Sequence, residues 1–217
     1  MARVKRTLDY LEQLKDHGQY SELRTLYDRW SDTLDAEALS RFLDFVWEEK
    51  GSIKPRLGEN TYSNLRGIAF EEFCFLVLSK AVRDAVAEGM IGLFWNERIL
   101  TEEFYIFENG QFKRFPKYKT VDLALGKSDG ALIHPFVIVS CKTWQCTNWL
   151  DEDRAVLDNI RLRYPHVLGY SLCMTMSVAR VSLISAQRTG LQVYDLSDPA
   201  RFGEFKTDIQ RVLVKVI

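Results

Sequence analysis

The stretch Phe136-Val-Ile-Val-Ser-Cys-Lys-Thr-Trp144 begins as a buried β-strand and places a lysine where the apolar run ends. Side chains in a strand alternate between two faces, so Ser140 and Lys142 share one face while Val139 and Cys141 share the other. A lysine at a strand end is often simply solvated. The alternative is that Lys142 points into a reaction site at the end of this strand. Residues elsewhere in the sequence distinguish a solvated lysine from a lysine in such a site.

Two acidic residues also stand where apolar residues are expected. In the strand pattern Thr120–Gly126, Asp122 lies on the face opposite Val121 and Leu123, and a mid-strand aspartate is unfavourable unless it finds a partner. In the helix pattern from Leu65 to Gly89, Glu71 interrupts an otherwise apolar stripe. Three successive elements therefore supply two carboxylates and one ammonium.

These residue types suit one chemistry. Hydrolysis of a phosphodiester uses a divalent cation to neutralise developing charge and to lower the pKa of the attacking water, and carboxylate oxygens suit Mg²⁺. A neighbouring lysine can orient or deprotonate that water, or stabilise the transition state. We therefore expect Asp122 and Glu71 to be Mg²⁺ ligands and Lys142 to act in catalysis.

The order of these parts resembles the PD-(D/E)XK nuclease superfamily, which includes most type II restriction endonucleases. The matching residues are Glu71 on a helix, Asp122 in a strand, and Ser140-Cys-Lys142 at a strand end, and the resemblance spans roughly Leu65 to Leu196. It implies an α/β fold with a restriction-endonuclease-like core, a mixed β-sheet flanked by helices. It also implies double-stranded DNA as substrate, Mg²⁺ as cofactor and a homodimer matched to a palindromic site.

The chain departs from the superfamily pattern at Ser140, where an Asp or Glu is usual. In the branch of restriction enzymes that cut around CCGG cores, a similar Ser-x-Lys occurs and the acid comes from the following helix. Here Asp151-Glu-Asp-Arg154 opens that helix, although the position matching the branch lies near Val156, one turn after Glu152 and Asp153.

A second interpretation takes the missing carboxylate from the first helix, as in other members of the superfamily. We favour Glu71 in this role, with Glu152 or Asp153 as alternatives. Glu72 is a rival to Glu71, because the sequence alone does not fix the rotation of the helix. A serine-substituted site without activity is the remaining possibility.

Candidate DNA contacts lie on both sides of these residues. Four cations precede Asp122 and alternate with aromatic residues, so they could follow a phosphate backbone, or they could protect a solvated hairpin edge. Amide and guanidinium groups that flank the proposed site are candidates for reading bases. The candidate phosphate contacts are Lys113, Arg114, Lys117 and Lys119, and the candidate base contacts are Asn60, Asn64, Arg66, Gln145, Asn148 and Arg154.

Composition sets the outer bounds. The 217 residues are 47% hydrophobic with a formal net charge of −1, and no apolar run approaches the ~20 residues of a membrane span. The first residues lack the apolar region of a secretory signal, so we expect a cytoplasmic protein. Four cysteines in mainly apolar stretches predict buried free thiols, and no Cys/His pairs at zinc spacing accompany them.

The chain is expected to divide into an N-terminal helical region (residues 1–55) and a nuclease core (residues 56–217). Three amphipathic helices are predicted in the first part, for packing or dimer formation, and the breaker-rich stretch Gly51–Asn64 is predicted to be a loop. The core should begin with a long helix, followed by separate strands at 92–99 and 102–107, a hairpin turn at Asn109-Gly110 and three further strands.

The sequence thus predicts a Mg²⁺-dependent DNA endonuclease, a type II restriction enzyme of a restriction-modification system. One alternative is a repair or junction nuclease of the same fold without sequence specificity. The other is a catalytically inactive member that binds DNA or a protein.

Overall fold

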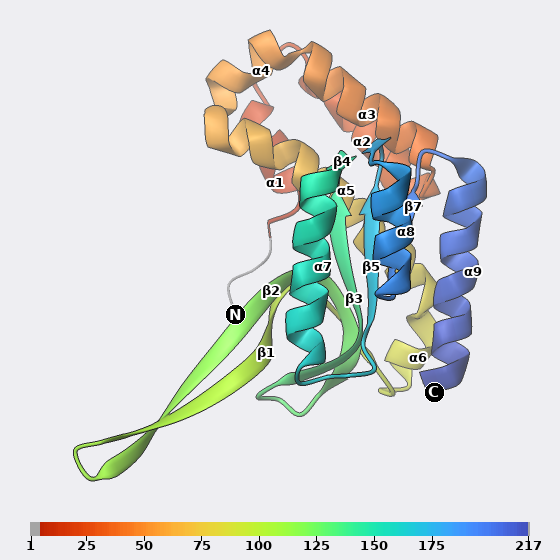
Figure 1. The fold of residues 1–217 in the computed structure, drawn as a ribbon. Coiled ribbons are helices and arrows are strands. Elements are labelled where there is room, and N and C mark those ends of the chain that lie inside the picture. Colours follow the sequence, from red (N-terminus) through yellow and green to blue (C-terminus); the bar gives the residue numbers. More distant parts are fainter. Residues whose placement is uncertain (1–4, 217) are drawn as a thin grey trace.

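A five-stranded mixed sheet forms the centre of the molecule in the computed structural model, which describes residues 5–216 (Figure 1). Three strands pair antiparallel, and two more extend the sheet in parallel with the third. In spatial order the strands are β1 (Gly92–Glu108), β2 (Gln111–Ser128), β3 (Ile133–Lys142), β5 (Leu168–Cys173) and β7 (Leu191–Asp195). Two short strands, β4 (Gln145–Cys146) and β6 (Met176–Ser177), pair with each other.

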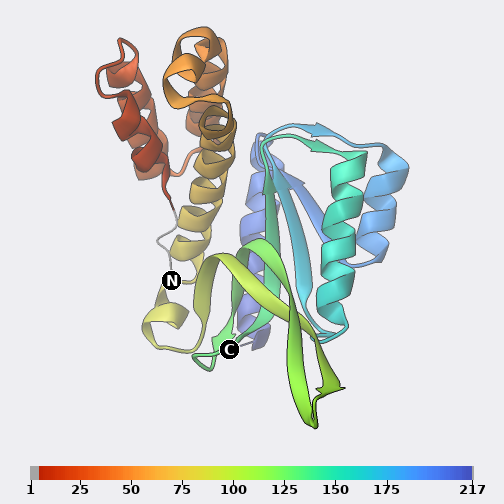
Figure 2. The same cartoon turned by 90° about the vertical axis from the view of Figure 1, so that its left-hand side faces the viewer.

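Helices cover both faces of this sheet (Figure 2). On one face lie α5 (Glu59–Ala81) and α9 (Pro199–Val216), and their side chains share an apolar core with Val139 and Cys141 of β3. On the other face lie α7 (Thr147–Arg161) and α8 (Arg180–Arg188). The predicted α/β fold, a mixed sheet flanked by helices, is confirmed.

The N-terminal helices pack against α5 rather than against the sheet. Their buried aromatic residues Trp30 and Phe42 contact each other, and Trp30 also contacts Phe73 of α5. These helices are α1 (Thr7–Leu11), a 3₁₀ turn (Glu12–Leu14), α2 (Tyr20–Thr33), α3 (Ala36–Glu48) and α4 (Lys50–Leu57).

The stretch Gly51–Asn64, predicted to be a loop, is helical. It forms most of α4 and the first turn of α5, and the break between them falls at Gly58, whose φ of +80° suits glycine. The burial of Ile53 and Tyr62 against the neighbouring helices outweighs the weak helix propensity of the stretch.

Other boundaries also differ from the sequence patterns. The two strands predicted at 92–107 are one strand, β1, with an irregularity between Leu100 and Glu102. Helix α7 begins at Thr147 rather than near Asp151, because Leu150 is buried and extends its apolar face. The first core helix stops at Ala81, and a short helix α6 (Arg83–Ala87) follows. Helix α8 was not predicted, since Ala186 is its one buried residue and its apolar stripe is weak.

The ends of β1 and β2 leave the body of the molecule as a long hairpin. We call residues 102–119 the hairpin arm, and Figure 1 shows it projecting away from the sheet. Almost all residues from 104 to 117 are exposed. The predicted turn at Asn109-Gly110 closes the arm, with both residues at positive φ as such a turn requires.

Candidate active site

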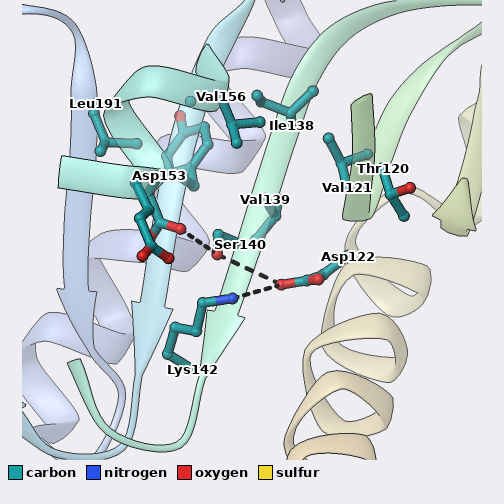
Figure 3. Close-up of a pocket in the computed structure, with 13 residues that line it drawn as sticks. Thr120, Val121, Asp122, Ile138, Val139, Ser140, Lys142, Asp153, Val156 and Leu191 are labelled. Atoms are coloured by element: carbon teal, nitrogen blue, oxygen red, sulfur yellow. Dashed lines mark hydrogen bonds and ion pairs between the residues drawn. The ribbon is translucent and has the colours of Figure 1, made fainter. Parts of the chain in front are cut away.

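A cavity of about 140 Å³ opens between β2, β3, β5 and α7, at the ends of the central strands. Four of its polar side chains point toward one another: Asp122, Ser140, Lys142 and Asp153 (Figure 3). The other residues that line the cavity are Thr120, Val121, Ile138, Val139, Glu152, Val156, Gly169, Tyr170 and Leu191.

Asp122 is held in place from β3. Its Oδ2 accepts a hydrogen bond of 2.7 Å from the backbone N–H of Cys141 and lies 3.7 Å from the Lys142 Nζ. The Oδ1 of Asp122 forms no hydrogen bond within the described residues. The mid-strand Asp122 therefore has the partners that we expected from the sequence, and its Oδ1 remains available to the cavity.

Ser140 lies between two carboxylates. Its Oγ donates a 2.8 Å hydrogen bond to Oδ1 of Asp153 and lies 3.5 Å from Oδ2 of Asp122. Ser140 lies on the face of the sheet that α7 covers, as the burial of its neighbour Ile138 in the core under α7 shows. The carboxylate nearest to the serine consequently comes from α7 and not from α5.

Asp153 is fixed by two further buried side chains. Its Oδ2 accepts hydrogen bonds from Gln145 Nε2 at 2.8 Å and from Ser171 Oγ at 2.7 Å, and Gln145 also donates to Ser171. Burial raises the pKa of the Asp153 carboxyl above its ordinary value, and the hydrogen bonds from Ser171 and Ser140 and the charge of Lys142 oppose this rise only in part. The network places the carboxylate with little freedom to move.

Lys142 is charged in this setting. Burial lowers the pKa of its ammonium, but the nearby carboxylates, Asp122 first and Asp153 second, outweigh burial and raise the pKa above its ordinary value. A protonated ammonium beside two carboxylates can stabilise negative charge on a substrate. It is poorly suited to take a proton from water.

The adjacent residues Glu71 and Glu72 face different parts of the molecule. Glu71 accepts a 3.1 Å hydrogen bond from Trp95 Nε1, and burial together with the charge of Asp122 raises the pKa of its carboxyl to about 7. Glu72 is 1% exposed and points to the N-terminal helices, where it accepts hydrogen bonds from the backbone N–H of Thr7 and from Tyr27. Of the two, Glu71 is the one close enough to sense the site.

The donor set fits Mg²⁺ held partly by water and substrate. Within residues 5–216 no three His, Cys, Asp or Glu side chains form a complete protein cage for a metal. Mg²⁺ is commonly bound through one or two carboxylates, with water and phosphate oxygens completing its shell. The free Oδ1 of Asp122 and the Oδ1 of Asp153, which accepts a single hydrogen bond, are the oxygens able to serve.

The cations predicted to contact phosphates are largely paired within the hairpin arm. Three of the four form ion pairs with glutamates on the opposite strand or across the turn, and Lys119 lies half-buried at the base of the arm. The pairs are Lys113–Glu108, Arg114–Glu103 and Lys117–Glu102. The arm is therefore close to neutral, as expected for the alternative of a protected hairpin edge.

The predicted base contacts take different positions. Gln145 is fully buried, and its amide is committed to Asp153 and Ser171, which removes it from any DNA groove. Arg154 bridges Asp151 and Ser185, and so joins α7 to α8. Arg66 packs its guanidinium over the ring of Trp47, 5.3 Å from its centre.

Asn60, Asn64 and Asn148 remain exposed on helices, the first two on α5 and the third in the first turn of α7. Glu152 lines the cavity but is exposed, in contrast to Asp153 beside it.

Two residues of the site were missed from the sequence. Ser171 is fully buried in β5 directly across from Ser140, and a serine inside the apolar strand Leu168–Cys173 was the available signal. Trp95 contacts Glu71, and nothing in its local sequence distinguishes it from an ordinary core aromatic.

Comparisons with known proteins give remote structural likenesses, and two of them are as follows. No family model and no curated protein sequence matches the chain. The structure of Can2 from Sulfobacillus thermosulfidooxidans in complex with cyclic tetra-adenylate aligns with a TM-score of 0.46 and 11% identity, over 89% of this chain and 53% of that one. This chain thus spans about half the length of Can2. The native BbvCI A2B2 tetramer aligns with a TM-score of 0.39 and 13% identity, over 87% of this chain and 81% of that one. Values this low define neither a family nor an activity for the chain.

Proposed function

We propose that this protein is a Mg²⁺-dependent endonuclease that hydrolyses phosphodiester bonds in double-stranded DNA, and that it cuts a short specific site as type II restriction enzymes do. The observation that carries the proposal is the convergence of Asp122, Ser140, Lys142 and Asp153 on one cavity. The superfamily pattern usually has an acid at the position of Ser140, this chain lacks it, and Asp153 brings a carboxylate to within 2.8 Å of the serine hydroxyl.

Each residue has a distinct part in the proposed reaction. Asp122 and Asp153 would hold the cation, and Ser140 lies between the two carboxylates. Gln145 and Ser171 position Asp153 without touching substrate. Lys142 stabilises the negative charge that develops on the phosphate as water adds to phosphorus and the bond to the leaving oxygen breaks. Mg²⁺, when bound, would neutralise phosphate charge and lower the pKa of the attacking water.

Glu71 takes a secondary part in this proposal. Its carboxyl lies on the α5 side of the sheet and is hydrogen-bonded to Trp95, and with a pKa of about 7 it is partly protonated at neutral pH. A carboxyl in that state is a weak cation ligand, and Asp153 lines the cavity together with Asp122, whereas Glu71 is not among the residues that line it. We therefore assign the second ligand to Asp153 and treat Glu71 as a modulator.

The proposal also includes a homodimer, because two-fold symmetry in the protein matches two-fold symmetry in a palindromic site. Two alternatives remain distinct from it. A nuclease of the same fold without sequence preference would have the same site, and an inactive relative would bind DNA or a protein without cutting.

Cleavage of supercoiled plasmid DNA separates these functions. With Mg²⁺ we expect discrete fragments, and with EDTA we expect no cleavage. A smear of fragments would indicate a nuclease without sequence preference, and intact plasmid under all conditions would contradict the nuclease proposal. An Asp122→Asn protein purified in parallel is the control, since any cleavage shared by both preparations comes from a contaminant.

A further inference from the structure

The outer part of the hairpin arm, residues 104–117, exposes an unusual amount of apolar surface. An isolated two-stranded hairpin is marginally stable in water, and exposed apolar patches of this size commonly mark interaction sites. Both faces of the arm carry large side chains between 42% and 72% exposed, and these are Phe104, Tyr105, Ile106, Phe107, Phe112 and Phe115.

The charges on the arm do not suit a nucleic acid. Polyanion binding needs unpaired cations that can displace counterions from phosphates. In the arm, Lys113, Arg114 and Lys117 are each paired with a glutamate of the arm itself. Aromatic residues in a nearly neutral setting are typical of protein–protein interfaces.

We propose that the hairpin arm is the surface through which two copies of this chain form a two-fold dimer. The inference rests on the proposed function, which includes a dimer, and it identifies the surface that forms it. Each arm lies against the second copy and buries its aromatic side chains there.

The exposed area is large enough for a stable dimer. A large apolar side chain carries about 200 Å² of surface, so the exposed fractions amount to about 600 Å² per arm. Burial of one face of each arm against matching surface gives a total of about 1,200 Å², and burial of both faces gives about 2,400 Å². Stable specific interfaces bury about 1,200–2,000 Å² or more.

Two further features favour a second copy over an unrelated protein. An isologous interface must be complementary to itself, and a nearly neutral arm that carries both signs of charge meets this condition. The arm is also the direct continuation of β2, the strand that carries Asp122. Contact through the arms therefore sets a fixed spacing between two active sites, as cleavage of both DNA strands requires.

Sedimentation velocity on the full chain, without DNA or metal, tests the proposal. We expect the parent protein to be a dimer at ~10 μM and the double variant Phe107→Glu/Phe112→Glu to be a monomer, with a dissociation constant raised at least ~100-fold. The control Val181→Glu/Val214→Glu adds the same charge at two exposed apolar positions outside the arm and should remain a dimer. Melting followed by circular dichroism checks folding, and Phe107→Ser/Phe112→Ser replaces the glutamate variant if that variant does not fold.

The other outcomes contradict either the dimer or the role of the arm as its interface. A parent protein that is monomeric at 100 μM overturns both the dimer and the role of the arm. A dimer that persists in the arm variants overturns the arm as the interface and leaves the dimer standing. A monomeric parent whose arm variants lose affinity for duplex DNA assigns the arm to nucleic acid and overturns the proposal. Plasmid cleavage is measured separately, so failure of the nuclease function is distinguishable from failure of the interface.

Discussion

Two buried carboxylates on opposite faces of the sheet have different surroundings. Glu72 is 1% exposed and lies in the packing between α5 and the N-terminal helices, where Thr7 and Tyr27 donate hydrogen bonds to it. Asp153 is 8% exposed and also accepts hydrogen bonds from neighbours, but it borders a cavity that contains Asp122 and Lys142. A buried, hydrogen-bonded acid is therefore not by itself a sign of function. What it faces decides whether it holds the fold together or can meet a substrate.

The largest effect on cleavage is expected at Asp122, which borders the same cavity as Asp153. Asp122→Asn should lower the rate of Mg²⁺-dependent cleavage at least ~1,000-fold, because it removes a charged ligand and leaves the fold intact. Binding to duplex DNA in Ca²⁺ should persist. The matched change Asp151→Asn alters an exposed acid of α7 and should keep the parental rate. Cleavage by Asp122→Asn at the parental rate would refute the assignment of the site.

Lys142→Ala should lower the rate of cleavage at least ~100-fold with little change in affinity, since the ammonium stabilises charge in the transition state. Single-turnover kinetics at saturating DNA measure the rate apart from binding. Lys119→Ala, at the base of the arm and outside the cavity, is the control and should leave the single-turnover rate unchanged. If Lys142→Ala weakens binding and leaves the single-turnover rate unchanged, Lys142 is a phosphate contact and not a catalytic residue.

Glu72→Gln tests whether Glu72 stabilises the fold and takes no part in cleavage. The amide offers one acceptor oxygen and no negative charge to the two donors, the Thr7 N–H and the Tyr27 hydroxyl, so the charge-assisted hydrogen bonds are weakened at a cost of about 1–2 kcal/mol. Urea denaturation should show this loss in the free energy of unfolding. The cleavage rate per folded molecule should stay at the parental value, and a large drop in that rate would break the distinction between the two acids.

Glu71→Gln should change stability in a pH-dependent way. The carboxyl has an ordinary pKa of 4.5 and a pKa of about 7 in the folded protein, mainly because burial disfavours its charge. Stability is therefore fully present below pH 4.5 and is lost as pH rises through 7, by on the order of 3 kcal/mol. Relative to the parent, the variant should gain free energy of unfolding between pH 5.5 and pH 8.5. A difference that does not vary with pH would show that Glu71 titrates normally.

Periodicity in the sequence was sufficient to predict a mixed sheet flanked by helices and to single out Asp122 and Lys142, although it divided β1 into two strands and missed α8. It was not sufficient to identify the second acid. Alternation places Ser140 on one face of β3, but it does not say which helix covers that face, and this depends on the crossover from β3 through α7 to β5. The rotation of α5, which separates Glu71 from Glu72, is likewise set by packing against Tyr27 and Trp95.

Local propensity failed where tertiary contacts decide. The stretch Gly51–Asn64 carries loop-forming residues, yet burial of Ile53 and Tyr62 holds it in helices. Gln145 carries an amide of the kind that reads bases, yet the pairing of β4 with β6 buries it beneath α7. Neither outcome follows from the residues alone, because both depend on segments distant in the sequence.

The assignment of Asp153 as the second cation ligand is tested most directly by single-turnover cleavage with Asp153→Asn and Glu71→Gln, at the same DNA and Mg²⁺ concentrations at pH 8. Asp153 is proposed to replace the acid that is missing at Ser140, with which it shares a 2.8 Å hydrogen bond. We expect a loss of at least ~1,000-fold for Asp153→Asn and a change within ~10-fold for Glu71→Gln. The reverse order, with Glu71→Gln inactive and Asp153→Asn close to the parent, would contradict this assignment.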